Sequence, residues 1–308
     1  MRICIIGCGS IGLLLAAKIA SAGEDVTLIC RRPEQVSLIR SRGVKVSYLS
    51  GIGIAKVKSI LAWRDVAYCD HVIIAVKAYD TRAALDVLKS CCKGFRLVVS
   101  AQNGIGPLEE VEGTLGVDRS AAMLLYIGAR RVEDNLVEHL GGNRVVIGTR
   151  STSKSTYEDL KDLRDVLSSA GFNVDMVDDI DAWRWDKLLV NAAINPVTAI
   201  LMSPNRVIIE SVHAKSLALT LAREGEEVAR RLNIRLPRDV EKAVITTASE
   251  TASNKSSMLQ DIEMGRKTEI DYINGVIVRL GEQHNVPTPY NRAVYLAVKA
   301  LEDVMTRR

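Results

Sequence analysis

A glycine-rich turn near the start of the chain constrains the fold more than any other feature. It is a GxGxxG pattern, Gly7-Cys8-Gly9-Ser10-Ile11-Gly12. The run before it, Arg2–Ile6, is apolar and rich in β-branched residues, which predicts a buried strand. Ser10–Ala22 has helical spacing and ends at Gly23, and Val26–Cys30 is a second apolar run. Strand, helix and strand within about 30 residues predict a βαβ unit.

In this context the pattern predicts a dinucleotide site. The first glycine permits the tight turn, the second lets backbone N–H groups approach a pyrophosphate, and the third lets the helix pack on the strand. The anion is expected at the helix N-terminus. All six residues from Gly7 to Gly12 are therefore predicted to bind the cofactor. A glycine-rich turn without a ligand is the alternative.

The apolar runs that follow predict a parallel sheet covered on both faces, because they are continuous rather than alternating. They are the strands 71–76 and 96–100, with a helix at 81–90 between them. From about residue 121 the pattern changes to an antiparallel extension. Its strands are expected at 123–127, 136–138 and 144–147, its turns at 133–135 and 141–143, and a helix at 157–170 and a strand at 172–177 complete the domain.

After Asp179 the pattern is helical almost to the end. Helices are expected at 180–200, 207–232, 238–250, 258–284 and 289–306. The last has Thr288 as N-cap and Pro289 in its first turn. We therefore predict an α/β chain with an N-terminal Rossmann-like dinucleotide-binding domain, residues 1–178, and a C-terminal all-helical domain, residues 179–308.

Composition excludes several classes of protein. The net charge of +4 and the lack of long basic blocks argue against a nucleic-acid surface. No apolar run reaches the roughly 18 residues of a membrane helix, and no signal peptide is visible, so we expect a cytoplasmic protein. The six cysteines form no CxxC pair and the four histidines lie far from them, which predicts no metal site. We expect buried, reduced thiols.

The end of the second strand bears on cofactor choice. NAD-specific sites usually carry an Asp or Glu there, whereas this chain has Cys30-Arg31-Arg32. An arginine can bind the 2′-phosphate of NADP with charge-assisted hydrogen bonds. Arg31 therefore predicts NADPH rather than NADH, unless the two arginines only begin an exposed loop.

Two further polar residues follow parallel strands. Lys77 and Asn103 stand near the carboxyl ends of their strands, where open α/β sheets bind ligands. Both are candidate contacts to cofactor or substrate, although many residues in such loops have no ligand.

The helical half holds a second group of candidates. Lys187, Asn191 and Asn195 are spaced i, i+4, i+8 and share one helix face in apolar surroundings. Such groups must be satisfied either by protein or by a ligand, and the spacing leaves both open. Glu269 adjoins an apolar stripe. Asn254 and Ser257 belong to a polar stretch before a helix, which fits either a carboxylate site or an N-cap.

Several of these segments together resemble the ketopantoate reductase (2-dehydropantoate 2-reductase) family. The resemblance spans nearly the whole chain in order. It rests on the opening GxGxxG, Lys77, Gln102-Asn103-Gly104, Trp185 to Ala199, Ser256-Ser257-Met258-Leu259-Gln260-Asp261 and Thr268-Glu269-Ile270-Asp271-Tyr272-Ile273-Asn274-Gly275.

The resemblance implies an NADPH-dependent reduction of ketopantoate to pantoate, a step of pantothenate and coenzyme A biosynthesis, with NADH as a possible substitute. It implies that Lys187 is the general acid and that Glu269 holds the lysine and the substrate oxygen. It also implies substrate contacts from the remaining polar residues, namely Asn191, Asn195, Asn103, Lys77, Asn254 and Ser257.

Some features leave alternatives open. Cys8 is larger than the residue common in such loops, and Cys91 and Cys92 match no family motif, so redox-sensitive surface thiols are a hypothesis. A reductase of another 2-oxo or 3-hydroxy acid is one alternative function. A non-catalytic NADP(H) sensor is another, but a sensor would not need Lys187 and Glu269. A homodimer is expected, since large helical domains often self-associate as two-fold dimers.

Overall fold

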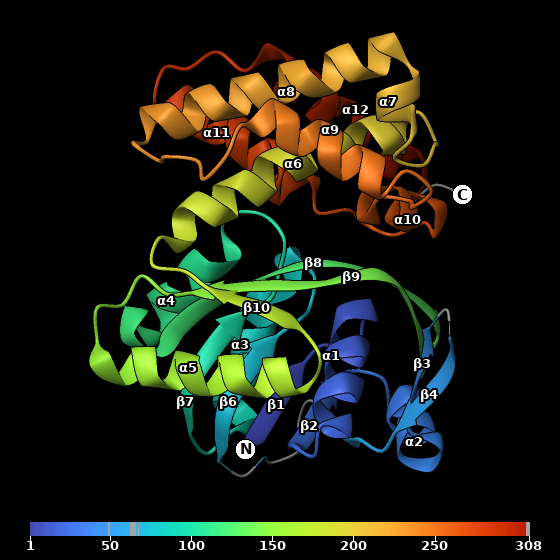
Figure 1. Cartoon of the computed structure of the whole chain (residues 1–308), viewed down its shortest axis with the longest axis vertical. Helices are drawn as coiled ribbons and strands as arrows, with labels where there is room; N and C mark the ends of the chain where they lie inside the picture. The colour runs from blue at the N-terminus through green and yellow to red at the C-terminus, as the bar shows by residue number, and fades with distance from the viewer. Residues whose placement is uncertain (49, 62–65, 67, 306–308) are drawn as a thin grey trace. The chain divides into compact units, whose positions relative to one another are not determined.

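The computed structural model describes residues 1–48, 50–61, 66 and 68–305, and these form two compact units (Figure 1). The first unit comprises residues 1–102 and 107–180. The second comprises the short segment 103–106 and the chain from Asp181 onward. A single boundary in the sequence cannot describe this arrangement, because residues 103–106 belong to the second unit although the chain on both sides of them belongs to the first.

One sheet organises the first unit. Its strands are β1 (Arg2–Ile6), β2 (Asp25–Cys30), β3 (Val44–Tyr48), β4 (Gly51–Ala55), β5 (Lys58–Leu61), β6 (Cys69–Ile74), β7 (Phe95–Ser100), β8 (Ser120–Glu133), β9 (Leu136–Gly148) and β10 (Asn173–Met176). Their order is β4-β3-β9-β8-β7-β6-β1-β2-β5, with β10 beside β9. The pairs from β5 to β7 are parallel and β8 and β9 are antiparallel, which confirms the predicted Rossmann-like sheet with an antiparallel extension.

Helices cover both faces of this sheet. Ile3 and Ile5 pack in a cluster with α1 (Ser10–Ser21) and α5 (Lys154–Ser169). Cys4 and Ile6 point into a second cluster with α3 (Thr81–Cys91) and α4 (Pro107–Leu115). The continuous apolar strands follow from this double burial. The remaining elements are α2 (Pro33–Arg42), η1 (Ala78–Asp80) and η2 (Val117–Arg119).

The predicted antiparallel region needs one correction. The expected turn at 141–143 is wrong, because Gly141 and Gly142 lie inside β9 with φ of 115° and 77°. A register shift opposite them, between Tyr126 and Gly128 of β8, accommodates the two glycines. Two long strands therefore replace the three short ones, and they reach the start of α1. The sequence prediction also lacked β3, β4, β5 and α2.

The second unit is helical, as predicted. Its elements are α6 (Ile180–Ile200), α7 (Val207–Glu210), α8 (Val212–Arg231), α9 (Val240–Glu250), α10 (Ser257–Glu263), η3 (Ile270–Tyr272), α11 (Asn274–Gln283) and α12 (Pro289–Met305). The apolar faces of these helices share one core. The helix expected at 207–232 is broken at Ser211, whose side chain accepts a hydrogen bond from the Ala214 N–H and caps α8.

The long helix expected at 258–284 is wrong, and the break matters for the site. The chain leaves α10 through Gly265, which has φ of 63°. Thr268 then donates from both its N–H and its hydroxyl to Glu302, each at 2.7 Å. These bonds hold an irregular segment that ends at Glu269, directly before η3. Helical spacing in the apolar residues concealed this interruption.

The expectation of reduced cysteines is wrong for four of the six. Disulfides join Cys4 to Cys69 and Cys8 to Cys30, with Cα–Cα distances of 6.2 and 5.4 Å, within the usual range. The partners are 65 and 22 residues apart in sequence, and strand pairing brings them together. Cys91 and Cys92 belong to neither bond.

Candidate active site

The glycine-rich turn has the geometry that the pattern predicts. Gly7 follows β1 with φ of 120°, a conformation that favours glycine. A Cβ on Gly12 would lie 1.8 Å from the Gly7 carbonyl oxygen, so Gly12 is required for the close approach of α1 to the turn. A Cβ on Gly9 would meet nothing within 4 Å. Gly9 is therefore free of a packing role, which leaves room beside the helix N-terminus for an anion.

The two arginines after β2 have different surroundings. The Arg31 side chain is 75% exposed, and its Nη2 lies 3.3 Å from the Asp80 carboxylate. Such an exposed ion pair contributes little to stability and does not prevent Arg31 from binding another anion. Arg32 donates to the Asp134 carboxylate and to Gln35 Oε1. Binding of a 2′-phosphate by Arg31 remains a prediction.

Sequence reasoning missed two residues that support the turn. Gln35 Nε2 and Arg131 Nη1 donate to the carbonyl oxygen of Cys8 at 3.0 and 3.4 Å. The backbone N–H of Arg131 also donates to Ser10 Oγ at 3.0 Å. Gln35 comes from α2 and Arg131 from β8, elements whose approach to the turn no local motif indicates.

Lys77 lies where the prediction placed it, just after β6. Its carbonyl oxygen accepts from Gln102 Nε2 at 3.3 Å, and the same amide donates to Thr81 Oγ1 at 2.8 Å. The buried Gln102 amide thus ties the end of β7 to the segment after β6. This bracing fixes the backbone at Lys77.

Three residues predicted from distant segments meet in the second unit. Lys187 Nζ donates to Asn103 Oδ1 at 3.1 Å, and Asn103 Nδ2 donates to Glu269 Oε2 at 3.2 Å. The two bonds fix the orientation of the Asn103 amide, since its oxygen must face the ammonium and its nitrogen the carboxylate. A cation, an amide and a carboxylate are therefore held in one chain of hydrogen bonds.

The backbone explains how Asn103 reaches this position. Gly104 has φ of 88°, and a Cβ there would lie 2.3 Å from the Tyr272 carbonyl oxygen. The same oxygen accepts from the Ile105 N–H at 3.1 Å. The segment 103–106 is therefore pressed against Tyr272, the last residue of η3, which lies three residues beyond Glu269.

The electrostatics of Lys187 suit proton donation. Burial lowers the pKa of the Lys187 ammonium from 10.5 to about 8, and the Glu269 carboxylate opposes part of that change. A lysine with this pKa remains largely protonated near neutral pH and gives up its proton far more readily than an exposed lysine.

The other predicted polar residues are placed but less constrained. Because α6 is continuous, Asn191 and Asn195 share the helix face of Lys187, Asn191 half-buried and Asn195 buried. Ser256, and not Ser257, caps α10, because its Oγ accepts from the Leu259 N–H at 3.1 Å. Ser257 is exposed in the first turn of that helix, and Asn254 is half-buried in the preceding turn.

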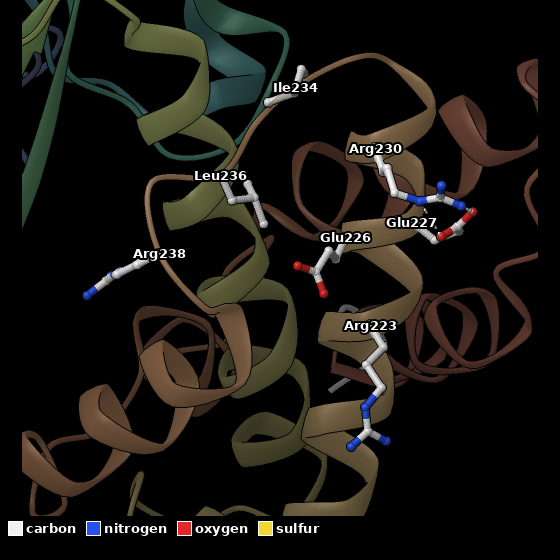
Figure 2. A pocket seen from close by; sticks show the side chains of 7 residues that line it. All are labelled: Arg223, Glu226, Glu227, Arg230, Ile234, Leu236 and Arg238. Carbon is white, nitrogen blue, oxygen red and sulfur yellow. Dashed lines mark hydrogen bonds and ion pairs between the residues drawn. The ribbon is translucent and has the colours of Figure 1, made fainter.

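A second pair supports the residue before Lys187. Asp186 is fully buried, and Arg238 donates to its two oxygens at 2.9 and 2.8 Å. Arg238 also borders a surface hollow that Figure 2 shows, lined by Arg223, Glu226, Glu227, Arg230, Ile234, Leu236 and Arg238. Its arginines are paired with carboxylates, namely Arg223 with Glu241, Arg230 with Glu227 and Arg238 with Asp186. We assign no ligand to this hollow.

Within the described residues, no group of three or more His, Cys, Asp and Glu side chains is arranged to hold a metal. The described helices likewise include none with the length and apolar character needed to cross a membrane.

Comparison with known proteins agrees with the fold. Residues 3–152 match the family model described as ketopantoate reductase PanE/ApbA, and residues 179–302 match the model of its C terminal part. The chain belongs to the ketopantoate reductase family. The sequence resemblance that predicted this family is thereby confirmed.

Curated family members are similar over their full length. The 2-dehydropantoate 2-reductase of Pyrobaculum aerophilum is 36% identical, over 97% of this chain and 98% of that protein. The enzyme of the same name from Pyrococcus horikoshii is 33% identical, over 99% and 98%.

Solved structures of the same architecture carry two different enzyme names. A PanE/ApbA family ketopantoate reductase from Ralstonia eutropha JMP134 is 29% identical, covers 99% of this chain and 100% of its own, and has a TM-score of 0.88. A D-mandelate dehydrogenase bound to NADH and anilino(oxo)acetate is 27% identical with the same coverage and a TM-score of 0.90.

Proposed function

We propose that this chain catalyses the NADPH-dependent reduction of ketopantoate to pantoate, a step of pantothenate and coenzyme A biosynthesis. The observation that carries the proposal is the hydrogen-bonded chain of Lys187, Asn103 and Glu269, in which burial lowers the pKa of the lysine to about 8. Full-length similarity to proteins named 2-dehydropantoate 2-reductase supports the choice of substrate.

For the cofactor we propose residues 1–178 as the NADP(H)-binding domain. NADPH, when bound, supplies the hydride. The open space beside Gly9 and the N-terminus of α1 fit its pyrophosphate. Arg31, which directly follows β2, is the residue we propose to bind the 2′-phosphate, and Lys77 and Asn103 are the further candidate contacts. NADH remains a possible weaker substitute.

For the chemistry we propose that Lys187 donates a proton to the carbonyl oxygen of the 2-oxo acid. Negative charge develops on that oxygen as the carbonyl is reduced, and an ammonium nearby stabilises it. Asn103 and Glu269 hold the lysine in its orientation through the observed bonds. The Lys187 side chain is half-buried, and the lowered pKa of its ammonium favours transfer of its proton.

For the substrate we propose residues 179–308 as the binding domain. Asn191 and Asn195 extend the face of Lys187 and present amides to the polar groups of the acid. Ser257, exposed in the first turn of α10, and Asn254 before it are proposed near the carboxylate.

The test is loss of NADPH absorbance with purified protein and ketopantoate. We expect rapid oxidation in the wild type and a loss of at least a hundredfold in Lys187→Ala. Lys154→Ala, which removes an exposed lysine of α5, is the matched control and should behave as wild type. Absence of ketopantoate-dependent oxidation in a folded protein that binds NADPH would contradict the proposal.

Cofactor preference has its own variant. Arg31→Ala should raise the Michaelis constant for NADPH and leave that for NADH nearly unchanged, since only NADPH carries the 2′-phosphate. If Arg31→Ala changes the Michaelis constants for NADPH and NADH by the same factor, Arg31 is not the residue that binds the 2′-phosphate.

The second candidate is reduction of a different 2-oxo acid. The likeness to a D-mandelate dehydrogenase favours it, because that enzyme shares the architecture and bears an aromatic ligand. A panel that includes branched and aromatic 2-oxo acids separates the two, ketopantoate giving the highest kcat/KM on our proposal. A non-catalytic NADP(H) sensor would turn over none of them.

We further propose that the enzyme is a cytoplasmic homodimer. Two-fold dimers are the commonest assemblies, and a small-molecule biosynthetic reductase has its substrates in the cytoplasm. Light scattering of the purified protein tests the assembly, and a mass of one chain would contradict it.

A further inference from the structure

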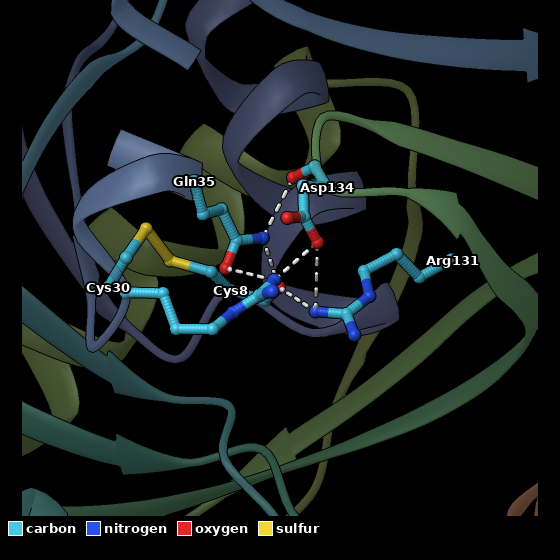
Figure 3. The surroundings of a disulfide bond; sticks show 6 residues. Cys8, Cys30, Gln35, Arg131 and Asp134 are labelled. Carbon is cyan, nitrogen blue, oxygen red and sulfur yellow. Dashed lines mark hydrogen bonds and ion pairs between the residues drawn. A yellow bond between two sulfur atoms is a disulfide. The ribbon is translucent and has the colours of Figure 1, made fainter. Parts of the chain in front are cut away.

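Cys8, the residue between the first two glycines of the turn, is held through both its side chain and its carbonyl group. Its Sγ is bonded to Cys30 at the end of β2. Its carbonyl oxygen accepts from Gln35 Nε2 and Arg131 Nη1 at 3.0 and 3.4 Å. Figure 3 shows the disulfide, the glutamine and the arginine around this one residue. Because the Cys8 carbonyl is held by these two bonds, the N–H of Gly9, which lies in the same planar peptide unit, is held as well.

The groups that hold Cys8 are themselves fixed. Gln35 is only 3% exposed and also donates to the Asp134 carbonyl oxygen at 2.8 Å. Arg131 is anchored by its backbone N–H to Ser10 Oγ and lies 4.0 Å from the Asp134 carboxylate. The turn is therefore held by α2, by the paired strands β8 and β9, and by the disulfide to β2.

The disulfide joins the two segments that the proposed cofactor site uses. Cys8 lies within the phosphate-binding turn, and Cys30 directly precedes Arg31, the proposed 2′-phosphate contact. The second disulfide joins Cys4 of β1, before the turn, to Cys69 of β6, and it involves no residue proposed to bind a ligand. The chain thus contains an internal control for the first bond.

We propose that the Cys8–Cys30 disulfide is a positioning element of the cofactor site, so that affinity for NADPH depends on the redox state of this bond. The inference rests on the proposed use of NADPH. Reduction breaks the S–S bond with two electrons and two protons from a dithiol, which closes to its own disulfide, and leaves thiols on Cys8 and Cys30.

The expected effect follows from the freedom that the bond removes. Without it, the turn must be ordered against Cys30 each time the cofactor binds, which reduces affinity. We expect the dissociation constant of NADPH to rise about tenfold, which corresponds to about 1.4 kcal/mol. Cys30 is 1% exposed and Cys8 is 8% exposed, so a reductant can reach the bond only through the small exposed part of Cys8. A cofactor bound at the turn should cover that part and therefore slow reduction of the bond.

The experiment compares two double variants with the wild type. NADPH affinity is measured by fluorescence titration, and the thermal midpoint of each protein is measured separately. Cys8→Ala/Cys30→Ala should bind NADPH about tenfold more weakly than untreated wild type and should not respond to dithiothreitol. Cys4→Ala/Cys69→Ala can lose thermal stability but should keep wild-type affinity and its response to reductant.

A second measurement needs no variant. Wild type is titrated with NADPH before and after dithiothreitol, and alkylation with mass spectrometry reports which cysteines are reduced. Weaker binding that follows reduction of Cys8 and Cys30 supports the proposal. Unchanged affinity after their reduction would overturn it, as would equal losses in both double variants. A protein that never binds NADPH would instead contradict the proposed function.

Discussion

The proposal that Lys187 is the proton donor predicts a specific pH dependence of kcat. The fall of its pKa from 10.5 to about 8 corresponds to about 3 kcal/mol against the ammonium form. The ammonium is the proton donor, so kcat should be constant at neutral pH and fall tenfold per pH unit above about 8. Glu269 opposes the effect of burial, so removing its charge should lower the pKa further.

The size of that change follows from the hydrogen-bonded chain. Lys187 and Glu269 are joined through one amide by bonds of 3.1 and 3.2 Å. Two unit charges roughly 8 Å apart at an effective dielectric constant of about 20 attract by about 2 kcal/mol, or about 1.5 pKa units. In Glu269→Gln the break in kcat should therefore move from about pH 8 to about 6.5.

The assay is kcat at saturating NADPH and ketopantoate from pH 5.5 to 10. Glu158→Gln, which neutralises an exposed carboxylate on α5, is the matched control and should keep the break near pH 8. A break that stays in place in Glu269→Gln, or moves to higher pH, would refute the assignment of the acid or its coupling to Glu269.

Two further predictions concern the first unit. Burial, aided by Arg96, lowers the pKa of His71 to about 4 from 6.5, and neither ring nitrogen has a hydrogen-bond partner among the described residues. The unfolded chain therefore binds this proton more tightly than the folded chain does, so the free energy of unfolding falls as pH decreases from about 6.5 toward 4, by about 2 kcal/mol between pH 7 and pH 5. In His71→Leu, denaturant unfolding should no longer show this part of the decrease. The same decrease in variant and wild type would contradict the prediction. Gly12→Ala should lower the thermal midpoint strongly because its Cβ would lie 1.8 Å from the Gly7 oxygen, whereas Gly9→Ala should keep the midpoint and weaken NADPH binding; equal midpoints in the two variants would contradict the packing role of Gly12.

Much of the fold could be predicted because its signals are local. The strand, glycine turn and helix at the N-terminus, and the apolar strands β6 and β7, follow from patterns within about ten residues. The prediction of a helix at 180–200 was correct for the same reason, and the four-residue spacing places Asn191 and Asn195 on the helix face of Lys187. The family resemblance then supplied roles that spacing alone left open.

The misses share a different cause, namely contacts between residues distant in sequence. Glu302 holds Thr268 outside a helix, 34 residues away, so the periodicity of 258–284 was misleading. The bonds from Gln35 and Arg131 to the turn depend on how α2 and β8 return to it. The disulfides were missed because cysteine spacing does not indicate which strands pair.

The same distinction applies within the site. Lys187 and Glu269 could be proposed from motifs, but their connection through Asn103 could not be derived from them. That connection depends on Gly104, whose positive φ lets residues 103–106 join the helical unit. A glycine after an asparagine is too common a signal to predict such a crossing.

The most direct test of the central claim follows the hydride itself. The protein is incubated with ketopantoate and NADPH that carries deuterium at C4 of the nicotinamide, in separate reactions for each face, and the product is analysed by mass spectrometry. We predict pantoate one mass unit heavier from one of the two labelled cofactors, with formation lost in Lys187→Ala. Oxidation of NADPH without labelled pantoate, or labelled pantoate formed equally well by Lys187→Ala, would contradict the account.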